Sequence, residues 1–493
     1  MEAGTNDPLK NFQRYALVVA AAVYAITSWF STGYHSADEH FQIVAFAQAK
    51  LGELPIHHLP WEYATGIRSS LQPWIAVAVF KTADVLGIHD PFSRTFFLRF
   101  LTAALALVAI AGFIRVILPT VAENARKPFI LLSYFLWFLP FLHVRFSSEG
   151  WSGIFLLLSI SAILSSEKSR SWALRAGLFA GSAILCRPPV GLIVISLIAW
   201  LVFVRKETIR AMFIVCLGIF VVLVLGALMD TAFYGQWTSS TWKYLHMGFA
   251  GDPDHRFDEL PWYYYPPWII KYGIPPIGAL ILLAFTALCI KRPRHWAVWC
   301  VVPFVLIHSL IPHKELRFLY PLADLVPLIL VLGLAELVPV LRAKWILSLL
   351  RIGAVALVVL NVIGLLVVMT SPAGEGRVTL AKALSARSME RPMHLGYIVP
   401  LEKAWRIELP AFYKQEGVDE VLIDANEERP WSGPLDLLIA HREDGYHFAD
   451  RNGLTIDRIT GAAPEFTEPL MRWYTWNEGE APWYLFKFSV AER

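Results

Sequence analysis

Residues 209–229 read IRAMFIVCLGIFVVLVLGALM, an apolar run with one charged residue near its start. Roughly 20 helical residues cross the hydrocarbon core of a bilayer, so this run is long enough to span a membrane. The whole chain of 493 residues is 56% hydrophobic and 17% charged, whereas a soluble protein of this length is less apolar and more charged. The sequence therefore predicts a polytopic integral membrane protein. Its net charge of +3 is small and dispersed, which argues against a nucleic-acid partner.

Comparable runs recur along most of the chain, and we expect about 11 to 13 transmembrane helices from them. The clearest runs are 15–31, 71–88, 94–118, 150–165, 172–204, 209–229, 266–290, 295–311, 318–341 and 345–370. The run 172–204 holds two spans broken at Arg187-Pro188-Pro189, because proline interrupts a helix. Residues 128–144 form a shorter run that predicts a half-span.

Short basic loops orient the chain in the membrane. Lysine and arginine are concentrated at 291–294 and at 342–344, and such residues are enriched in cytoplasmic loops. The intervening loop, which contains residues 313–317, therefore faces outward. Basic residues before the first span keep the N-terminus inside, so the first outer loop, residues 32–70, is predicted on the same face as residues 313–317.

Residues 1–371 form the predicted membrane domain, and residues 372–493 differ from it in composition. Charged and Gly/Pro-rich segments alternate there with short apolar stretches, which is typical of buried strands with intervening helices. The stretches are 394–399, 418–423, 435–440 and 483–490. We expect a small α/β domain on the outer side of the membrane.

The first outer loop contains His35-Ser36-Ala37-Asp38-Glu39-His40-Phe41-Gln42. Ionisable residues at the edge of a bilayer are costly unless they are paired or hydrated. Two adjacent carboxylates flanked by histidines fit a general base with an orienting partner, and they also fit a metal site. The spacing matches no common zinc pattern, which argues against a metal. A hydrated loop that enters a helix is the alternative without a catalytic role.

A second motif, His313-Lys314-Glu315-Leu316-Arg317, lies between two strongly apolar runs. If these residues begin a helix, His313 and Arg317 share one face, four positions apart. Three cationic side chains at a membrane boundary fit a phosphate site. A basic membrane anchor would explain them in a cytoplasmic loop, but this loop is predicted outside, which favours the phosphate site.

Two further charged motifs and an aromatic region have less specific patterns. Trp61-Glu62 with Arg68 precedes one span, and Arg145-Phe146-Ser147-Ser148-Glu149 separates two apolar runs. Both fit an active site, but interfacial anchors are the favoured explanation of the first motif, and an ordinary loop explains the second as well as a site does. The aromatic residues around Trp262-Tyr263 fit either an interfacial belt or a surface that stacks on sugar and lipid.

Taken together, these motifs resemble those of the family 22 glycosyltransferases, the membrane mannosyltransferases of lipid-linked glycan and GPI-anchor assembly. The stretch from His313 to Pro321 is similar to the family signature, and the Asp38-Glu39 stretch resembles its first-loop acidic motif. Trp61-Glu62 with Arg68-Ser69 and the stretch Phe233-Tyr234-Gly235-Gln236-Trp237-Thr238 also fit. The matching blocks run from about residue 35 to residue 321. The outer domain looks like that of the members that add the third mannose of the GPI anchor.

One position departs from the family pattern. Where the family usually reads Arg-Thr-Leu-Ser/Thr-Asn, this chain reads Arg145-Phe146-Ser147-Ser148-Glu149. A carboxylate thus replaces an amide, which puts in question any donor or acceptor contact normally made there and is consistent with a different acceptor.

The resemblance implies a GT-C type of fold, a polyprenyl- or dolichyl-phosphate mannose donor, a lipid-linked glycan or glycolipid acceptor, and inversion at the anomeric carbon. Asp38 is the expected general base, with Glu39 as its alternative or as a group that orients the acceptor. The leaving phosphate gains charge, which fixed cations can meet without a metal or another cofactor. The residues assigned to the phosphate are His313, Lys314, Arg317, Arg68 and Arg145. The residues assigned to the rest of the substrates are His35, His40, Gln42, Trp61, Glu62, Glu149, Glu315, Trp262 and Tyr263.

Two other classes of protein remain open from the sequence. A secondary transporter would place its charges near the bilayer midplane and usually shows an internal repeat. A non-catalytic scaffold for glycan assembly would use the outer domain as its binding module. The chain is expected in the endoplasmic reticulum membrane if it is eukaryotic and in the inner membrane if it is bacterial, in contact with membrane lipid. Its active site is expected on the lumenal or periplasmic side.

Overall fold

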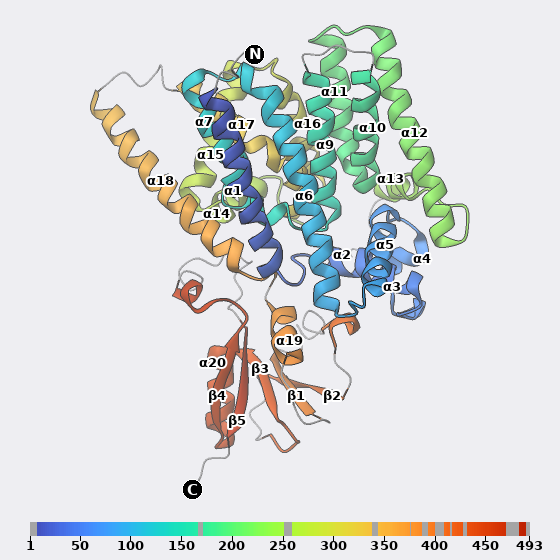
Figure 1. The fold of residues 1–493 in the computed structure, drawn as a ribbon, viewed down its shortest axis with the longest axis vertical. Coiled ribbons are helices and arrows are strands. Elements are labelled where there is room, and N and C mark those ends of the chain that lie inside the picture. The colour runs from blue at the N-terminus through green and yellow to red at the C-terminus, as the bar shows by residue number, and fades with distance from the viewer. Residues whose placement is uncertain are drawn as a thin grey trace, which may run out of the picture. The chain divides into compact units, whose positions relative to one another are not determined.

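The computed structural model describes residues 7–165, 171–250, 259–337, 344–374, 376–386, 393–399, 409–414, 417–426, 431–469 and 483–489 (Figure 1). The chain divides into two compact units. The first comprises Met1–Ala25, Ala37–Thr82 and Leu98–Leu366, and the second comprises Ile26–Ser36, Ala83–Phe97 and Val367–Arg493. The division between residues 371 and 372 that composition suggests stays a prediction.

The apolar part of the chain is helical, because a backbone in lipid must satisfy its own hydrogen bonds. Its α-helices are α1 Pro8–Phe30, α2 Ala37–Glu39, α3 Ala45–Leu51, α4 Trp61–Thr65, α5 Leu71–Val85, α6 Pro91–Ile117, α7 Glu123–Phe135, α8 Leu139–Leu142, α9 Ser148–Leu164, α10 Ser171–Cys186, α11 Gly191–Phe203, α12 Ile209–Tyr234, α13 Ser240–Ala250, α14 Tyr265–Tyr272, α15 Pro275–Lys291, α16 Trp296–Leu310, α17 Val326–Leu337 and α18 Lys344–Thr370. A π-helix, His40–Val44, joins α2 to α3, and a 3-10 helix, Leu316–Leu325, leads into α17.

Several of these helices can cross a membrane. Four stretches in the described residues are long and apolar enough by length and composition, namely Pro91–Thr120, Ile209–Tyr234, Leu316–Leu337 and Arg351–Thr370. Helices α15 and α16 pass the same test as a pair that bends by 116°. Three shorter apolar helices, Ser148–Leu164, Ser171–Cys186 and Pro188–Phe203, add to this set. The protein is therefore an integral membrane protein, while the total of 11 to 13 spans stays a prediction.

One local expectation from the sequence is confirmed, while the half-span at 128–144 stays a prediction. The run 172–204 is broken after Cys186, where a 3-10 turn at Pro188–Val190 separates α10 from α11. The run 128–144 contains a helix that ends at Phe135 and a single turn at Leu139–Leu142, which is shorter than a full span. In the first case the cause is the Pro188-Pro189 pair, because proline supplies no backbone donor.

Glycines let helices of the first unit approach closely. Helix α10 packs against both α9 and α12 (Figure 1). A Cβ atom added to Gly218 of α12 would lie 2.9 Å from the backbone nitrogen of Leu178 in α10, and one added to Gly177 would clash with the Val215 carbonyl. A Cβ atom on Gly153 of α9 would lie 3.2 Å from Cα of Pro321. Hydrophobic burial does not drive helices together inside lipid. Small residues instead let the backbones approach closely, so that van der Waals packing stabilises the helix pair.

A buried polar relay joins three segments of the first unit. The hydroxyl of Tyr24 in α1 lies 2.8 Å from His143 Nδ1, and His143 Nε2 lies 2.8 Å from a carboxylate oxygen of Asp324. All three residues are buried. Buried polar groups are stable only when paired, so this relay fixes the segment after α8 against the 3-10 helix Leu316–Leu325. These two segments carry Arg145 and Arg317 respectively.

The second unit contains a five-stranded sheet in the order β2-β1-β3-β5-β4 (Figure 1). The strands are β1 Met393–Val399, β2 Val418–Asp424, β3 Leu437–His441, β4 Thr455–Gly461 and β5 Trp483–Ser489. Strand β1 is parallel to β2 and β3, whereas β5 is antiparallel to β3 and β4. The four expected strands and the small α/β domain are confirmed. Strand β4 was not expected, because its polar sequence TIDRITG contains no apolar run.

Two helices cover opposite faces of this sheet. Leu380 and Leu384 of α19 Arg377–Ser385 pack with Leu395 and the residues on the same face. Phe448 of α20 Arg442–Asn452 packs with Ile398 and the residues on the other face. Successive strand residues point to opposite sides, so both faces are apolar and both are buried.

The two N-terminal segments of the second unit make specific contacts with its C-terminal part. The backbone nitrogen of Ala373 donates to the carbonyl of Thr32 at 2.9 Å. Phe92 stacks on Tyr413 with ring centroids 5.5 Å apart. These contacts explain why segments 26–36 and 83–97 group with the sheet rather than with the first unit.

The glycine contacts between α10 and α12 predict a large effect of one methyl group. We expect Gly177→Ala to destabilise the folded protein by about 1–3 kcal/mol, because the new Cβ meets backbone and not a flexible side chain. Gly112 lies within α6, and a Cβ added to it meets nothing within 4 Å. Gly112→Ala should therefore be neutral or stabilising by about 0.5–1 kcal/mol. Thermal unfolding in detergent compares the variants, and equal stability of the two would contradict the packing.

Candidate active site

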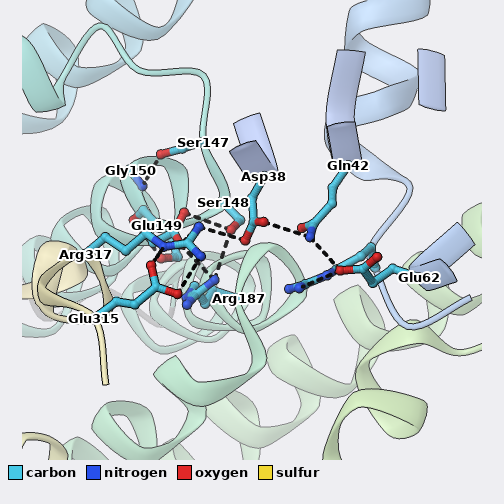
Figure 2. Close-up of polar contacts among 12 residues, drawn as sticks. Asp38, Gln42, Glu62, Ser147, Ser148, Glu149, Gly150, Arg187, Glu315 and Arg317 are labelled. Carbon is cyan, nitrogen blue, oxygen red and sulfur yellow. Dashed lines mark hydrogen bonds and ion pairs between the residues drawn. The ribbon is translucent and has the colours of Figure 1, made fainter. Parts of the chain in front are cut away.

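Charged side chains from five segments of the first unit meet in one cluster (Figure 2). Asp38 is supplied by α2, Glu62 by α4, Glu149 by α9 and Arg317 by the start of the 3-10 helix Leu316–Leu325. Arg187 comes from the break between α10 and α11. The cluster is a chain of ion pairs and hydrogen bonds, with Asp38 between Arg317 on one side and Gln42 on the other.

Arg317 is held by two carboxylates. Its Nη1 donates to Asp38 Oδ2 at 2.7 Å, and its Nη2 donates to Glu315 Oε1 at 2.9 Å. Its Nε donates to the other oxygen of Glu315. The pair with Glu315 is therefore bidentate, the geometry in which a guanidinium is most tightly oriented. The expected approach of the acidic motif to the cationic motif is confirmed, across 279 positions of sequence.

Glu149 forms the second centre of the cluster. Its Oε1 lies 2.9 Å from Nη1 of Arg187 and 3.6 Å from Nη1 of Arg317. The Ser148 hydroxyl donates to Glu149 Oε2 at 3.0 Å and accepts from Arg187 Nη1 at 3.4 Å. The Glu149 and Arg187 side chains are only 3% and 8% exposed. A buried pair of this kind is costly to break from one side, because the remaining charge loses its partner.

On the other side of Asp38, Gln42 connects two carboxylates. Its amide nitrogen donates to Asp38 Oδ1 and to Glu62 Oε1, both at 2.9 Å. Arg68 Nη2 lies 3.6 Å from the same oxygen of Glu62. Gln42 belongs to the π-helix His40–Val44, a local widening that often marks functional sites. Asp38 is therefore oriented by an amide on one oxygen and a guanidinium on the other.

A further ion pair of the cluster is buried. Arg145 Nη1 lies 3.5 Å from Glu39 Oε2, with side chains 3% and 9% exposed. His40 follows directly and is buried as well. Burial lowers the pKa of His40 to about 3, so its imidazole is neutral near pH 7. His40 can therefore act by hydrogen bonding but not as a cation.

Local structure explains why these residues meet. The Ser147 hydroxyl accepts from the backbone nitrogen of Gly150 at 3.0 Å and so caps α9, which places Glu149 in the first helical turn. A carboxylate is favoured there by the helix dipole. Asp230 of α12 accepts from the nitrogen and hydroxyl of Ser70 at 2.9 and 2.8 Å, and from the nitrogen of Ser240 at 2.9 Å. It thereby anchors the segment that carries Arg68.

Charges in the cluster control two carboxyl groups. Burial alone would raise the pKa of Asp38, but the charges of Arg317, Arg68 and Arg187 outweigh burial and hold it below its usual value. Burial also opposes ionisation of Glu315, yet hydrogen bonds from His313 and Arg317 lower its pKa to about 2. Both carboxyl groups are therefore ionised near neutral pH in the free protein.

The structure places the remaining predicted residues in different surroundings. Lys314 donates to the carbonyls of Leu260 and Ile311, both at 2.6 Å, and to that of Pro312 at 3.3 Å. Its ammonium is thus engaged with backbone. His313 Nε2 lies 3.0 Å from Glu315 Oε1. The condition that residues 313–317 begin a helix is not met, because the 3-10 helix begins at Leu316, so His313 and Arg317 share no helical face.

The aromatic residues assigned to the substrates are exposed side chains. Trp61, Trp262 and Tyr263 are 41%, 72% and 55% exposed. This exposure suits interfacial anchors. His35 is half-buried and belongs to the second unit.

Sequence reasoning missed Arg187. We interpreted Arg187-Pro188-Pro189 as a turn between spans, whereas the guanidinium pairs with Glu149 and lies 5.1 Å from the ring centroid of Phe318. The available signal was a charged residue inside the apolar run 172–204, since an ionisable residue at membrane depth usually has a partner and a function. Its partner could not be read from the sequence, because Glu149 lies in another helix.

The composition of the cluster limits its chemistry. Its carboxylates are Asp38, Glu39, Glu62, Glu149 and Glu315, and its guanidinium groups are those of Arg68, Arg145, Arg187 and Arg317. Every one of these guanidinium groups has a carboxylate within 3.6 Å. An entering anion must therefore compete with a carboxylate for a guanidinium. The arrangement combines anion binding with proton acceptance at a single contact, between Arg317 and Asp38.

Comparison with known proteins identifies the family. The model of the Alg9-like mannosyltransferase family matches residues 16–391. The chain belongs to this family. The match includes both the acidic motif around Asp38 and the motif around Arg317, so the cluster is built from residues inside the family domain.

Curated relatives of the chain are named as mannosyltransferases. The chain is 26% identical over 275 residues to GPI alpha-1,2-mannosyltransferase 3 of Xenopus laevis, covering 54% of this chain and 50% of that protein. It is 26% identical over 332 residues to GPI mannosyltransferase 3 of Yarrowia lipolytica, covering 64% of this chain and 62% of that protein. The matched region thus spans between half and two thirds of each relative.

A solved structure shares the fold. The ArnT structure from Cupriavidus metallidurans bound to undecaprenyl phosphate superposes with a TM-score of 0.51 at 12% identity, over 97% of this chain and 98% of that one. At this identity the likeness shows the fold alone. The expected GT-C architecture, with apolar helices and a small C-terminal sheet domain, is confirmed.

The ion pairs of Glu315 predict a specific dependence of stability on pH. Its folded-state pKa of about 2 lies below the ordinary value of 4.5, so its contribution is complete above pH 4.5 and is lost as pH falls towards 2. Replacing it with Glu315→Gln should remove this part of the acid sensitivity. Thermal unfolding of the wild type and of Glu315→Gln in detergent, over about two pH units below pH 5, measures the difference in acid sensitivity. Parallel pH profiles for the two proteins would rule out the assigned ion pairs.

Proposed function

We propose that the protein is a membrane mannosyltransferase that moves mannose from a polyprenyl- or dolichyl-phosphate donor to a lipid-linked glycan or glycolipid acceptor. The observation that carries this proposal is the 2.7 Å contact between Asp38 and Arg317, which puts a proton acceptor beside a phosphate-binding cation. The names of the relatives support the sugar and an α-linked product. The undecaprenyl phosphate in the ArnT structure supports a lipid-phosphate donor for this fold.

The reaction is a single displacement. The acceptor oxygen attacks the anomeric carbon, and the bond from that carbon to the phosphate oxygen breaks. Its electron pair leaves with the lipid phosphate, and the acceptor proton passes to Asp38. Inversion then gives an α-mannoside from a β-linked donor. The departing phosphate gains one negative charge, which a fixed guanidinium stabilises without reorganisation.

Arg317 couples donor binding to activation of the base. In the free protein its guanidinium neutralises Asp38 and holds the pKa of that carboxyl low, which makes Asp38 a weak base. A phosphate that takes over the Nη1 donor of Arg317 removes this partner. The proton affinity of Asp38 then rises when the donor is bound. The bidentate contact with Glu315 keeps Arg317 in place during the exchange.

The other members of the cluster orient the central pair or balance the charge around it. Gln42 orients the second oxygen of Asp38 and connects it to Glu62. Arg187 keeps Glu149 neutralised beside Arg317. Arg68 and Arg145 are assigned to the phosphate as further cations, and His313 and Lys314 support the loop that carries Arg317. The reaction is proposed to need no metal or other cofactor, since these cations meet the charge of a phosphomonoester.

The compartment follows from the same proposal. The charged cluster is placed on the lumenal face of the endoplasmic reticulum in a eukaryote, or on the periplasmic face of the inner membrane in a bacterium. The short basic loops at 291–294 and 342–344 support this orientation.

A transfer assay tests the proposal against its alternatives. Purified protein is incubated with radiolabelled polyprenyl-phosphate mannose and a glycolipid acceptor, and in parallel it is reconstituted into vesicles. We expect label in the acceptor and none accumulated in the lumen. Uptake without transfer would indicate a transporter. Binding without either would indicate a scaffold, and both outcomes would refute the proposed reaction.

Two substitutions separate the roles of the central pair. Asp38→Asn should lower kcat by about 10²-fold or more, in line with general-base contributions, without weakening donor binding, because the phosphate no longer competes with a carboxylate for Arg317. Arg317→Gln should mainly weaken donor binding, because the phosphate loses a charge-assisted hydrogen bond. Glu53→Gln removes an exposed carboxylate from the same outer loop and should leave the kinetics unchanged. Steady-state kinetics on the three variants decide, and a fully active Asp38→Asn enzyme would exclude Asp38 as the base.

A further inference from the structure

The tyrosine run before α14 contains a buried hydroxyl that the proposed mechanism does not use. Tyr265 is the first residue of α14 and has no exposed surface. Its hydroxyl has no hydrogen-bond partner among the described residues. Its neighbour Tyr263, by contrast, is 55% exposed. Tyr265 therefore supplies a buried hydroxyl that can donate a hydrogen bond to a ligand.

Backbone contacts place Tyr265 beside the Arg317 motif. The nitrogen of Leu260 donates to the carbonyl of Pro312 at 3.0 Å, and Lys314 Nζ donates to the carbonyl of Leu260 at 2.6 Å. Helix α14, which begins five residues later, packs against the 3-10 helix Leu316–Leu325. The contacts of Lys314 and Leu260 thus join the segment before α14 to the Arg317 motif.

The electrostatic surroundings of the hydroxyl agree with this position. Tyr265 lies within range of the charges of Glu315 and Arg187. Burial, followed by the charges of Tyr264 and Glu315, raises the pKa of its phenol, and the charge of Arg187 opposes this only in part. The group is therefore a protonated donor throughout the neutral range.

A buried hydroxyl without a partner is unfavourable in the free protein. Phenylalanine would fill almost the same volume without that cost, whereas a ligand oxygen that accepts the hydroxyl would remove it. A site of this kind discriminates strongly for a ligand that completes the hydrogen bond. The hydroxyl thus has the properties of a binding group that is prepared before the ligand arrives.

We propose that the Tyr265 hydroxyl binds an oxygen atom of the donor headgroup, next to the ion pairs of Arg317 and Arg187. The donor class rests on the proposed function. The acceptor is either a phosphate oxygen or a hydroxyl of the sugar, since both are oxygen acceptors within the same headgroup. Tyr265 is then a substrate-binding residue that sequence analysis did not single out from its aromatic neighbours.

The test is Tyr265→Phe in the full-length protein. Without ligand, its unfolding temperature should equal or exceed that of the wild type, because no hydrogen bond is lost. Its affinity for polyprenyl-phosphate mannose, measured by thermal-shift titration, should fall about tenfold, the effect of one lost hydrogen bond. Tyr397→Phe is the matched control, because the Tyr397 hydroxyl donates to Glu420 at 3.2 Å and its loss should lower the unfolding temperature.

A second titration identifies the atom. Polyprenyl phosphate without sugar should bind Tyr265→Phe about tenfold more weakly if the tyrosine addresses the phosphate, and equally well if it addresses the sugar. Both results support the proposal. Wild-type affinity of Tyr265→Phe for the intact donor overturns it, and so does a lowered unfolding temperature, which would mean that the hydroxyl has a partner in the free protein.

The same titrations distinguish this proposal from the proposed function. They measure binding alone, so absence of transfer by the wild type would refute the reaction while leaving the binding comparison intact. If the wild type does not bind the intact donor, the role of Tyr265 is refuted as well.

Discussion

The contact between Arg317 and Asp38 joins two segments 279 positions apart, and the first unit is organised to hold it. Charges at the edge of a membrane are costly when they are buried without a partner, because they lose their hydration without compensation. Each of the two side chains in this contact is therefore oriented by a further partner. Gln42 orients Asp38, and Glu315 orients Arg317. The relay through His143 and Asp324 holds the 3-10 helix against the segment after α8. The partners that neutralise these charges thus also fix the geometry of the contact between Arg317 and Asp38.

The same requirement restricts how a phosphate can enter. Each arginine of the cluster is already near a carboxylate, so binding must exchange one partner for another. The pairs differ in how readily they can exchange. Asp38 and Glu315 are 22% and 34% exposed as side chains, whereas Glu149 and Arg187 are 3% and 8% exposed. Solvent can compensate a carboxylate that is released at Arg317, and it cannot do so at Arg187. In the proposed mechanism, this exchange at Arg317 is also the one that frees Asp38 to act as the base.

The sequence was sufficient for features that depend on composition and on one strong local signal. Long apolar runs gave the helices, the Pro188-Pro189 pair gave the break between α10 and α11, and the basic loops gave the shared face of the two motifs. It was insufficient where the outcome depends on backbone path or on a distant partner. Lys314 has the chemistry of a phosphate ligand, but in the structure its ammonium donates to three backbone carbonyls, and the sequence does not show this arrangement. Strand β4 carries no apolar pattern and is defined by its pairing with β5.

Glu149 shows how a departure from the family pattern can be accommodated. An amide at this position would leave Arg187 with a neutral partner and a net positive charge available to an anion. The carboxylate instead neutralises Arg187 at 2.9 Å, and the N-terminal turn of α9 favours its charge. It also lies 3.6 Å from Arg317, where it opposes the approach of a second anion. Under the proposed function, the donor phosphate therefore binds at the more exposed face of Arg317, beside the neutralised Glu149–Arg187 pair.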